Sequence, residues 1–270
     1  MLPDADTLAK ARLQLDIDGP VATITLDEPD RRNSQTPSMW HGLAAIGANL
    51  PEEVRVVVLK GAGDCFSAGI DLRLFGPEGL PGEEQVPMTA PEEEILAAIE
   101  SYQAGFAWLR DPRWVSIAQV HSHAIGAGFQ LALACDLRVV CEDAQFCMKE
   151  PALGLVPDLT GTKPLVDLVG PARALEMCAT ARLVGAAEAR ETGIASVVVP
   201  ADELDATTAD LAAAILANDV GAVRETKALL AGAPDNDLAA QCRAEREAQA
   251  RRFAALAGGP ATPGTPAQTG

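Results

Sequence analysis

Two acidic residues lie in an otherwise apolar stretch of the chain, "MKEPALGLVPDLTGT" (residues 148–162). Glu150 and Asp158 are eight residues apart, and most of their neighbours are Leu, Val, Pro and Gly. The simple interpretation is that both carboxylates point into water. The alternative is that they act as a pair on a substrate, because carboxylates in apolar surroundings can exchange protons near neutral pH.

Two glycine-rich segments offer a second kind of chemistry. "FSAGIDL" (66–72) ends a loop after an apolar stretch, and "IGAGFQL" (125–131) opens a stretch with a helical pattern. A helix N-terminus carries unpaired N–H groups and the positive end of the helix dipole. A pair of such N–H groups stabilises a developing enolate oxygen. The competing interpretation is that the glycines serve tight turns and close packing. Neither segment has the pattern of a phosphate-binding or dinucleotide-binding loop.

The surrounding pattern predicts alternating strands and helices. Apolar and polar residues alternate over residues 11–29, on both sides of Asp18 and Gly19, which is typical of a β-hairpin. Asn33 and Ser34 offer caps to a helix from about Pro37 to Leu50. Buried strands are expected at 54–61, 114–120 and 195–200, two short strands at 137–148, and helices at 92–110, 160–169, 172–180 and 186–193. The pattern predicts helices from 202 to 256, with breaks near 218–221 and 232–236. This order favours an α/β fold.

Composition excludes several classes of protein. The chain has 270 residues and a net charge of −17, which argues against non-specific nucleic-acid binding. No apolar run is long enough to span a membrane, and the first residues do not resemble a signal peptide, so a cytoplasmic protein is expected. The six cysteines are expected to be free thiols. His121 and His123 suggest no third metal ligand nearby, so no metal is expected.

Order, spacing and local motifs resemble the crotonase (enoyl-CoA hydratase/isomerase) superfamily. The resemblance covers residues 12–230, through "VATITLDEPDRRN", "VRVVVLKGAGDCFSAGIDL", "IGAGFQLALACDLRVVCEDAQF" and "KEPALGLVPDLTGTKPLVDLVGPARALEM". It implies a crotonase-like spiral of repeated ββα turns at 1–200 and a C-terminal helical trimerisation region at 201–257. Residues 258–270 are low in complexity and predict a disordered tail. The implied partner is an acyl-CoA thioester, with self-association as a trimer or hexamer. No cofactor is implied, because coenzyme A is part of the substrate.

The resemblance also implies roles for individual residues. The thioester oxygen would be held by the backbone N–H groups of Ile70 and Ala127. Hydratases of the family activate water with two glutamates, which fall here at Gln130 and Glu150. Gln is not a general base, so the hydratase pair is half absent.

Asp158 points toward another branch of the family. Most hydratases have Gly at this position, whereas the dienoyl-CoA isomerase branch has an acid eight residues after the retained glutamate. In that reading Asp158 is the base at C2 and Glu150 the acid at the distant carbon, with the two roles interchangeable. The dienoyl isomerases also have an acid at the position of Gln130, which this chain lacks. The competing interpretation of Asp158 is an N-cap for the helix that follows.

Arg31, Arg32 and Arg73 match the family region near the CoA phosphates and adenine, although Arg31 could equally be a solvated surface residue. The substrate-binding candidates from the same segments are Ala68, Asp71, Gly126 and Gln130. The segment 76–91 and the helix from residue 94 are expected to shape the acyl pocket. Three functions remain open at this point: a double-bond isomerase, a hydratase that uses Glu150, and a non-catalytic acyl-CoA-binding protein.

Overall fold

The structure, a computed structural model, describes residues 1–77, 79–83 and 85–258. Its described residues form two compact units, Met1–Ala217 and a second unit that begins at Asn218. The boundary expected after residue 200 falls directly after the last strand of the first unit. Of the expected disordered tail, residues 259–270 lie outside the described part of the chain.

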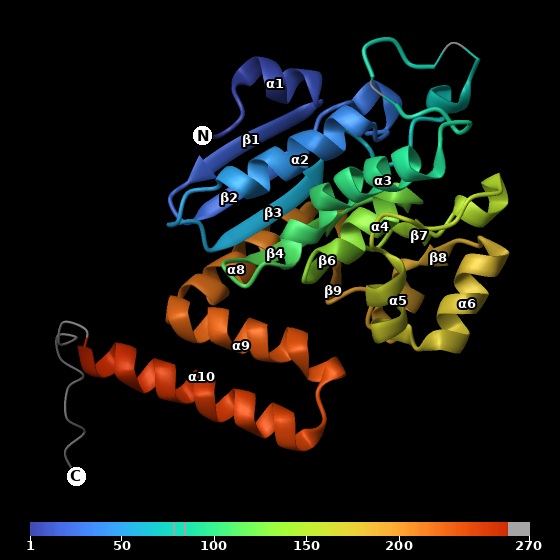
Figure 1. Ribbon diagram of the computed structural model, residues 1–270. Helices are drawn as coiled ribbons and strands as arrows, with labels where there is room; N and C mark the ends of the chain where they lie inside the picture. Colours follow the sequence, from blue (N-terminus) through green and yellow to red (C-terminus); the bar gives the residue numbers. More distant parts are fainter. Residues whose placement is uncertain (78, 84, 259–270) are drawn as a thin grey trace. The chain divides into compact units, whose positions relative to one another are not determined.

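The first unit is built around a six-stranded sheet with the order β1-β2-β3-β4-β6-β9 (Figure 1). The strands are β1 (Leu13–Asp18), β2 (Val21–Leu26), β3 (Val56–Gly61), β4 (Val115–Val120), β6 (Leu137–Cys141) and β9 (Val197–Val199). The expected hairpin is confirmed, because β1 and β2 pair antiparallel across Asp18 and Gly19, and Gly19 has φ +52°. All later neighbours in this sheet pair in parallel.

A second, three-stranded sheet has the order β5-β7-β8. Its strands are β5 (His123–Ile125), β7 (Gln145–Cys147) and β8 (Val184–Gly185). Successive strands β4 to β7 alternate between the two sheets, so each turn of the chain contributes a strand to both. The repeated ββα turns are thereby confirmed. The pattern had not predicted β5 and β8, since a strand of two or three residues shows no period of its own.

Helices cover both faces of the large sheet. They are α1 (Ala5–Lys10), α2 (Pro37–Asn49), α3 (Glu92–Ala107), α4 (Ala127–Ala134), α5 (Thr162–Val169), α6 (Pro171–Thr180), α7 (Ala186–Glu191) and α8 (Leu204–Leu216). Val57 and Leu59 of β3 join the core that contains α2 and α3, whereas Val56 and Val58 pack with α8 on the other face. The β-branched run in β3 therefore serves two separate apolar cores.

Two helix starts differ from expectation. The N-cap of α2 is Thr36, whose hydroxyl accepts from the N–H of Met39, because Pro37 must take the first helical position. Asn33 instead accepts from the N–H of Glu28 and donates to the carbonyls of Ala62 and Cys65. Helix α5 begins at Thr162 after Gly161, without a side-chain cap. The interpretation of Asp158 as its N-cap is therefore wrong.

The second unit contains α9 (Val220–Gly232) and α10 (Leu238–Gly258), which pack against each other. The two expected breaks are confirmed, since α8 ends at Leu216 and α9 ends at Gly232. Ion pairs join the helices through Arg251 with Glu225 and Arg252 with Asp219. None of the described helices is both long enough and apolar enough to cross a membrane.

Candidate active site

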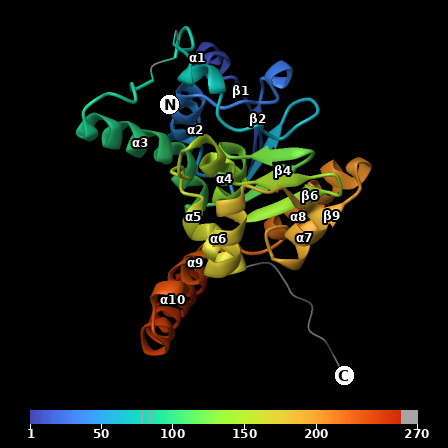
Figure 2. The ribbon, with the colours of Figure 1, turned by 90° about the vertical axis from the view of Figure 1, so that its right-hand side faces the viewer.

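A cavity of about 480 Å³ lies in the first unit. Its wall is mostly apolar and is lined by Pro37, Trp40, Ala68, Gly69, Ile70, Leu72, Leu74, Phe75, Gln85, Val86, Pro87, Met88, Ile95, Ala98, Ile99, Tyr102, Ile125, Gly126, Ala127, Lys149, Glu150, Leu153, Leu155, Val156, Asp158 and Leu159. Both segments expected to shape an acyl pocket, the loop before α3 and α3 itself, contribute residues to this wall. Helix α3 packs beside α2 (Figure 2). The cavity has the size and lining of a small-molecule site.

Backbone pairing leaves the N–H group of Ile70 unused. Gln35 pairs with Ile70 in a parallel bridge, in which the Gln35 N–H donates to the Gly69 carbonyl at 2.7 Å. The Asp71 N–H donates to the Gln35 carbonyl at 2.9 Å. Because these bonds use the neighbours of Ile70, its own N–H lies on the other side of the strand. It has no hydrogen-bond partner among the described residues.

A buried polar network holds this strand. The Ser67 hydroxyl donates to the Asn33 carbonyl at 2.8 Å and accepts from the Gln35 side-chain amide at 3.1 Å. The Gln35 amide oxygen accepts from the indole N–H of Trp40 at 2.8 Å. Gln35 and Ser67 are fully buried, so the network fixes the backbone before Ile70 in a single arrangement.

The second N–H group belongs to Ala127, the first residue of α4. Gly126 is the N-cap of this helix and has φ +51° and ψ −120°, a conformation open to glycine alone. A Cβ atom on Gly69 would lie 3.5 Å from the Ala127 nitrogen, so the two glycine-rich segments are in contact. Ile70 and Ala127 both line the cavity. Both backbone N–H groups therefore belong to residues of the cavity wall.

Glu150 begins the short 3-10 helix Glu150–Leu153, and its side chain enters the cavity wall. The residue is 8% exposed. Its Oε1 atom accepts from Nε2 of Gln130 at 2.6 Å, whereas Oε2 has no partner among the described residues. Burial raises the pKa of Glu150, and the negative charge of nearby Asp158 raises this pKa further. The carboxyl group therefore keeps its proton to a higher pH than an exposed glutamate does.

Asp158 lies on the same wall, in the loop before α5. The side-chain amide of Gln103, on α3, donates to the Asp158 carbonyl at 2.7 Å. Burial raises the pKa of Asp158 as well. Among the described residues that line the cavity, Glu150 and Asp158 are the two acids.

Gln130 is not among the described residues that line the cavity. It is fully buried and contacts Glu150 through its side-chain amide. Its amide oxygen accepts from the N–H groups of Leu159 at 2.8 Å and Gly161 at 3.2 Å. Of the other residues expected to bind the substrate, Ala68 and Gly126 are on the wall.

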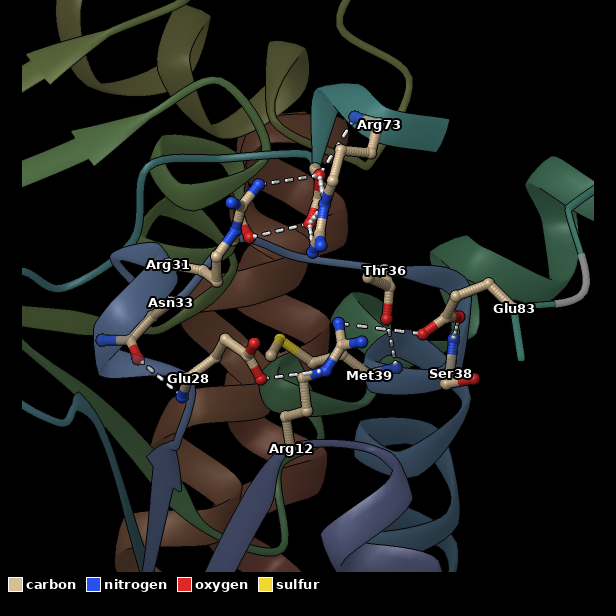
Figure 3. Close-up of polar contacts among 11 residues, drawn as sticks. Arg12, Glu28, Arg31, Asn33, Thr36, Ser38, Met39, Arg73 and Glu83 are labelled. Atoms are coloured by element: carbon tan, nitrogen blue, oxygen red, sulfur yellow. Dashed lines mark hydrogen bonds and ion pairs between the residues drawn. The ribbon is translucent and has the colours of Figure 1, made fainter. Parts of the chain in front are cut away.

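Two arginines converge on the carboxylate of Asp71. Arg73 binds it through its side chain and its backbone N–H, and Arg31 lies 3.7 Å away (Figure 3). Asp71 is 2% exposed, and its hydrogen bond with the Arg73 side chain lowers its pKa to about 2. Asp71 therefore anchors Arg31 and Arg73. Neither arginine is among the described residues that line the cavity, although both side chains are partly exposed.

Arg32 is exposed and has φ +53°. Its carbonyl accepts from the N–H of Ala68 at 2.8 Å, so this residue supports the cavity wall through its backbone.

Two residues near the site were not found from the sequence. Glu83 has a side chain that is 3% exposed, and it accepts from the N–H of Ser38 at the start of α2 while Arg12 lies 3.8 Å away (Figure 3). It anchors the loop that carries Gln85 and Met88 onto the cavity wall. Lys149, next to Glu150, also lines the cavity. Glu83 is one of three glutamates in a Pro- and Gly-rich loop, and nothing in the local sequence marks it as an anchor.

The His pair shows no arrangement for a metal. His121 bonds the Gly63 carbonyl through Nε2, and His123 bonds the Ser122 hydroxyl through Nδ1. Across the described ranges, no group of three or more His, Cys, Asp or Glu side chains could hold a metal ion.

A family model described as "Enoyl-CoA hydratase/isomerase" matches residues 16–257. The chain belongs to the enoyl-CoA hydratase/isomerase family. Within this crotonase superfamily, the "Putative enoyl-CoA hydratase/isomerase YngF" of Bacillus subtilis (strain 168) is 33% identical over 231 residues, which are 84% of each chain. The peroxisomal "Delta(3,5)-Delta(2,4)-dienoyl-CoA isomerase" of Arabidopsis thaliana is 35% identical over 179 residues, 66% of this chain and 64% of that protein.

Solved structures show the same fold. A "putative enoyl-CoA hydratase" of Thermobifida fusca YX, in complex with CoA, is 54% identical with a TM-score of 0.92, covering 96% of this chain and 99% of that one. The T. fusca protein is also known in complex with acetoacetyl-CoA, with the same identity and TM-score over 95% of this chain and 100% of that chain. The crotonase fold expected from the sequence is thereby confirmed.

Proposed function

We propose that this member of the family shifts double bonds in an unsaturated acyl-CoA, as a dienoyl- or 3-enoyl-CoA isomerase. One observation carries the proposal: Glu150 faces the side-chain amide of Gln130 rather than a second carboxylate, and the other acid on the cavity wall is Asp158. A water held between two glutamates has no counterpart in this arrangement of described residues. Two separated acids suit transfer of a proton between two carbons.

The thioester oxygen would accept hydrogen bonds from the N–H groups of Ile70 and Ala127. Asp158, ionised, would take a proton from C2, and the electron pair would move onto the thioester oxygen as an enolate. Glu150, protonated, would give its proton to the distant carbon as the electrons return through the conjugated chain. The pair holds one proton before and after the step, and the raised pKa values of both acids support this sharing.

The relatives support the substrate class. The T. fusca protein binds CoA and acetoacetyl-CoA, and the apolar lining of the cavity suits an acyl chain. Arg31 and Arg73 are proposed to face the CoA phosphates, because Asp71 holds their guanidinium groups together while leaving them partly exposed.

A hydratase is the second candidate. It is favoured by the names of the T. fusca structures and by the unpartnered Oε2 atom of Glu150, which could bind a water molecule.

In the test, the purified protein is given a 3,5-dienoyl-CoA, a 3-enoyl-CoA or a 2-enoyl-CoA. The conversion of each ester is followed by its absorbance. We expect the 3,5-diene or the 3-enoyl ester to be converted. Glu150→Gln and Asp158→Asn should each lower kcat for the 3,5-diene by roughly 10²- to 10⁴-fold, since each removes one proton carrier. The matched control is Asp167→Asn, which removes an exposed carboxylate paired with Lys163 on α5.

Three results would redirect the assignment. Conversion of the 3-enoyl ester alone, unaffected by Asp158→Asn, would leave a one-carboxylate isomerase. If the main activity is hydration of the 2-enoyl ester, seen as loss of its chromophore, the protein is a hydratase. Binding of all three esters without turnover would make it an acyl-CoA-binding protein.

A further inference from the structure

The side chain of Gln130 makes three hydrogen bonds, one to Glu150 and two to the loop that carries Asp158. Its Oε1 atom accepts from Leu159 and Gly161, and its Nε2 atom donates to Glu150. Leu159 directly follows Asp158 in the chain, so one amide connects Glu150 to the loop that carries Asp158. Gln130 lies in the first turn of α4, where its N–H donates to the Gly126 carbonyl. The same short helix therefore presents the N–H of Ala127 and this amide.

The network leaves the amide one orientation. Backbone N–H groups can donate but cannot accept, so the atom that faces Leu159 and Gly161 must be the amide oxygen. The NH₂ group then points at Oε1 of Glu150, which must act as an acceptor. A proton on Glu150 is consequently placed on Oε2, the atom without a partner among the described residues.

Packing holds the amide in this place. A Cβ atom on Gly161 would lie 2.6 Å from Cγ of Gln130 and 3.0 Å from its Oε1 atom. Gln130 is fully buried, so water cannot take the place of a hydrogen bond that is lost there. Loss of such a bond leaves its partner unsatisfied and costs free energy.

We propose that Gln130 is a positioning residue that sets the place of Glu150 relative to Asp158 and directs Oε2 of Glu150 to the reacting carbon. The role of Gln130 in directing Oε2 to the reacting carbon rests on the proposed function. It also gives a reason for Gln rather than an acid at this position. A carboxylate would satisfy the two backbone N–H groups equally well, but it would face Oε1 of Glu150 without a proton to donate.

Two variants separate the parts of this role. Gln130→Met removes all three hydrogen bonds at similar volume, whereas Gln130→Glu keeps the two bonds from Leu159 and Gly161 and places a negative charge against Glu150. We expect kcat for the isomerised substrate to fall by roughly 10- to 100-fold in both, with KM changed little, because the acyl-CoA contacts remain. The pH at which Glu150 loses its proton should move upward in both variants, and further in Gln130→Glu, where like charges meet.

The control is Gln119→Met on β4, which removes a similarly buried amide whose Nε2 donates to Asp205. This variant should keep the pH profile of the wild-type enzyme. A second measurement needs no turnover: the pH dependence of thermal unfolding, with and without Glu150→Gln in the same chain, reports the protonation of Glu150 directly. An inactive wild-type protein would remove the proposed function and leave this measurement intact.

If Gln130→Met does not fold, Gln130→Glu decides the matter, since its backbone partners stay bonded. A Gln130→Glu protein with the pH profile and kcat of the wild-type enzyme would overturn the proposal. So would a loss of kcat in Gln130→Met matched by Gln119→Met, which would show a purely structural role.

Discussion

At the scale of single residues, the site contains carboxyl groups whose pKa values are shifted from those of exposed acids. Glu150 is nearly removed from solvent, and the amide of Gln130 donates to its Oε1 atom. Such a group disfavours its own ionised form. Asp71 shows the opposite case, because hydrogen bonds from Arg73 keep it ionised. Burial therefore dominates the pKa of Glu150, whereas hydrogen bonding dominates that of Asp71.

The raised pKa of Glu150 predicts how stability depends on pH. The folded protein binds this proton more tightly than the unfolded chain, so the free energy of unfolding falls as pH rises from the ordinary glutamate pKa through the raised one. Each unit of raised pKa corresponds to about 1.4 kcal/mol. Glu150→Gln should remove this loss, so the variant should gain stability over the wild-type chain as pH increases.

Thermal unfolding between pH 4 and pH 8 measures this difference, with Glu100→Gln on the exposed side of α3 as the control. A difference in Tm between Glu150→Gln and wild type that does not change with pH would show that Glu150 titrates like an exposed glutamate.

At the scale of elements, the start of α4 combines the tightest backbone requirements of the site. Gly126 adopts positive φ directly before Ala127, and its missing side chain leaves room for the carboxylate of Glu150. Gly128 packs against Ser67, where a Cβ atom would lie 2.6 Å from the Ser67 carbonyl oxygen. The helix can therefore approach the Ile70 segment closely, which brings two backbone N–H groups to one cavity.

Replacement of Gly126 should damage both stability and activity. In Gly126→Ala the added methyl would strain the backbone and lie 3.3 Å from Oε1 of Glu150. We expect a loss of about 1–3 kcal/mol in the free energy of unfolding, measured by urea denaturation. Gly185→Ala is the control, because Gly185 has φ −77° and nothing within 4 Å of an added Cβ. Equal effects of the two substitutions would contradict a special backbone role for Gly126.

At the scale of the whole molecule, the second unit carries apolar side chains that its own helices do not cover. Leu230 of α9 and Leu238, Phe253 and Leu256 of α10 are each more than 60% exposed. Exposed apolar residues in such number are typical of a protein interface. We propose that they mediate self-association, which the resemblance to the family implies as a trimer or hexamer.

A charge on this surface should reduce the assembly. Phe253→Glu is expected to lower the molecular mass measured by light scattering after size exclusion, relative to the wild-type protein. Gln249→Glu places the same charge on an exposed polar position of α10 and should leave the mass unchanged. A monomeric wild-type protein, or an unchanged mass for Phe253→Glu, would speak against this interface.

Much of this protein was predictable from local sequence. The hairpin around Gly19, the buried run of β3 and the helical end follow from periodicity and turn chemistry, which act over a few residues. The two glycine-rich segments and the two acids were found in the same way, and so was the family. The cap of α2 was misplaced because Asn, Ser and Thr are all good caps, and the bond that decides among them is seen in three dimensions.

The tertiary structure decided what the sequence could not. Gln130 reads as a lost catalytic acid in the sequence, and the fold shows that its amide joins Glu150 to the loop of Asp158. Glu83 is not marked by its local sequence, and the fold buries its side chain at the start of α2. In both cases the partner lies far away along the chain. A side chain's type is a local property, whereas its hydrogen-bond partner depends on which distant segments the two sheets and their helices bring together.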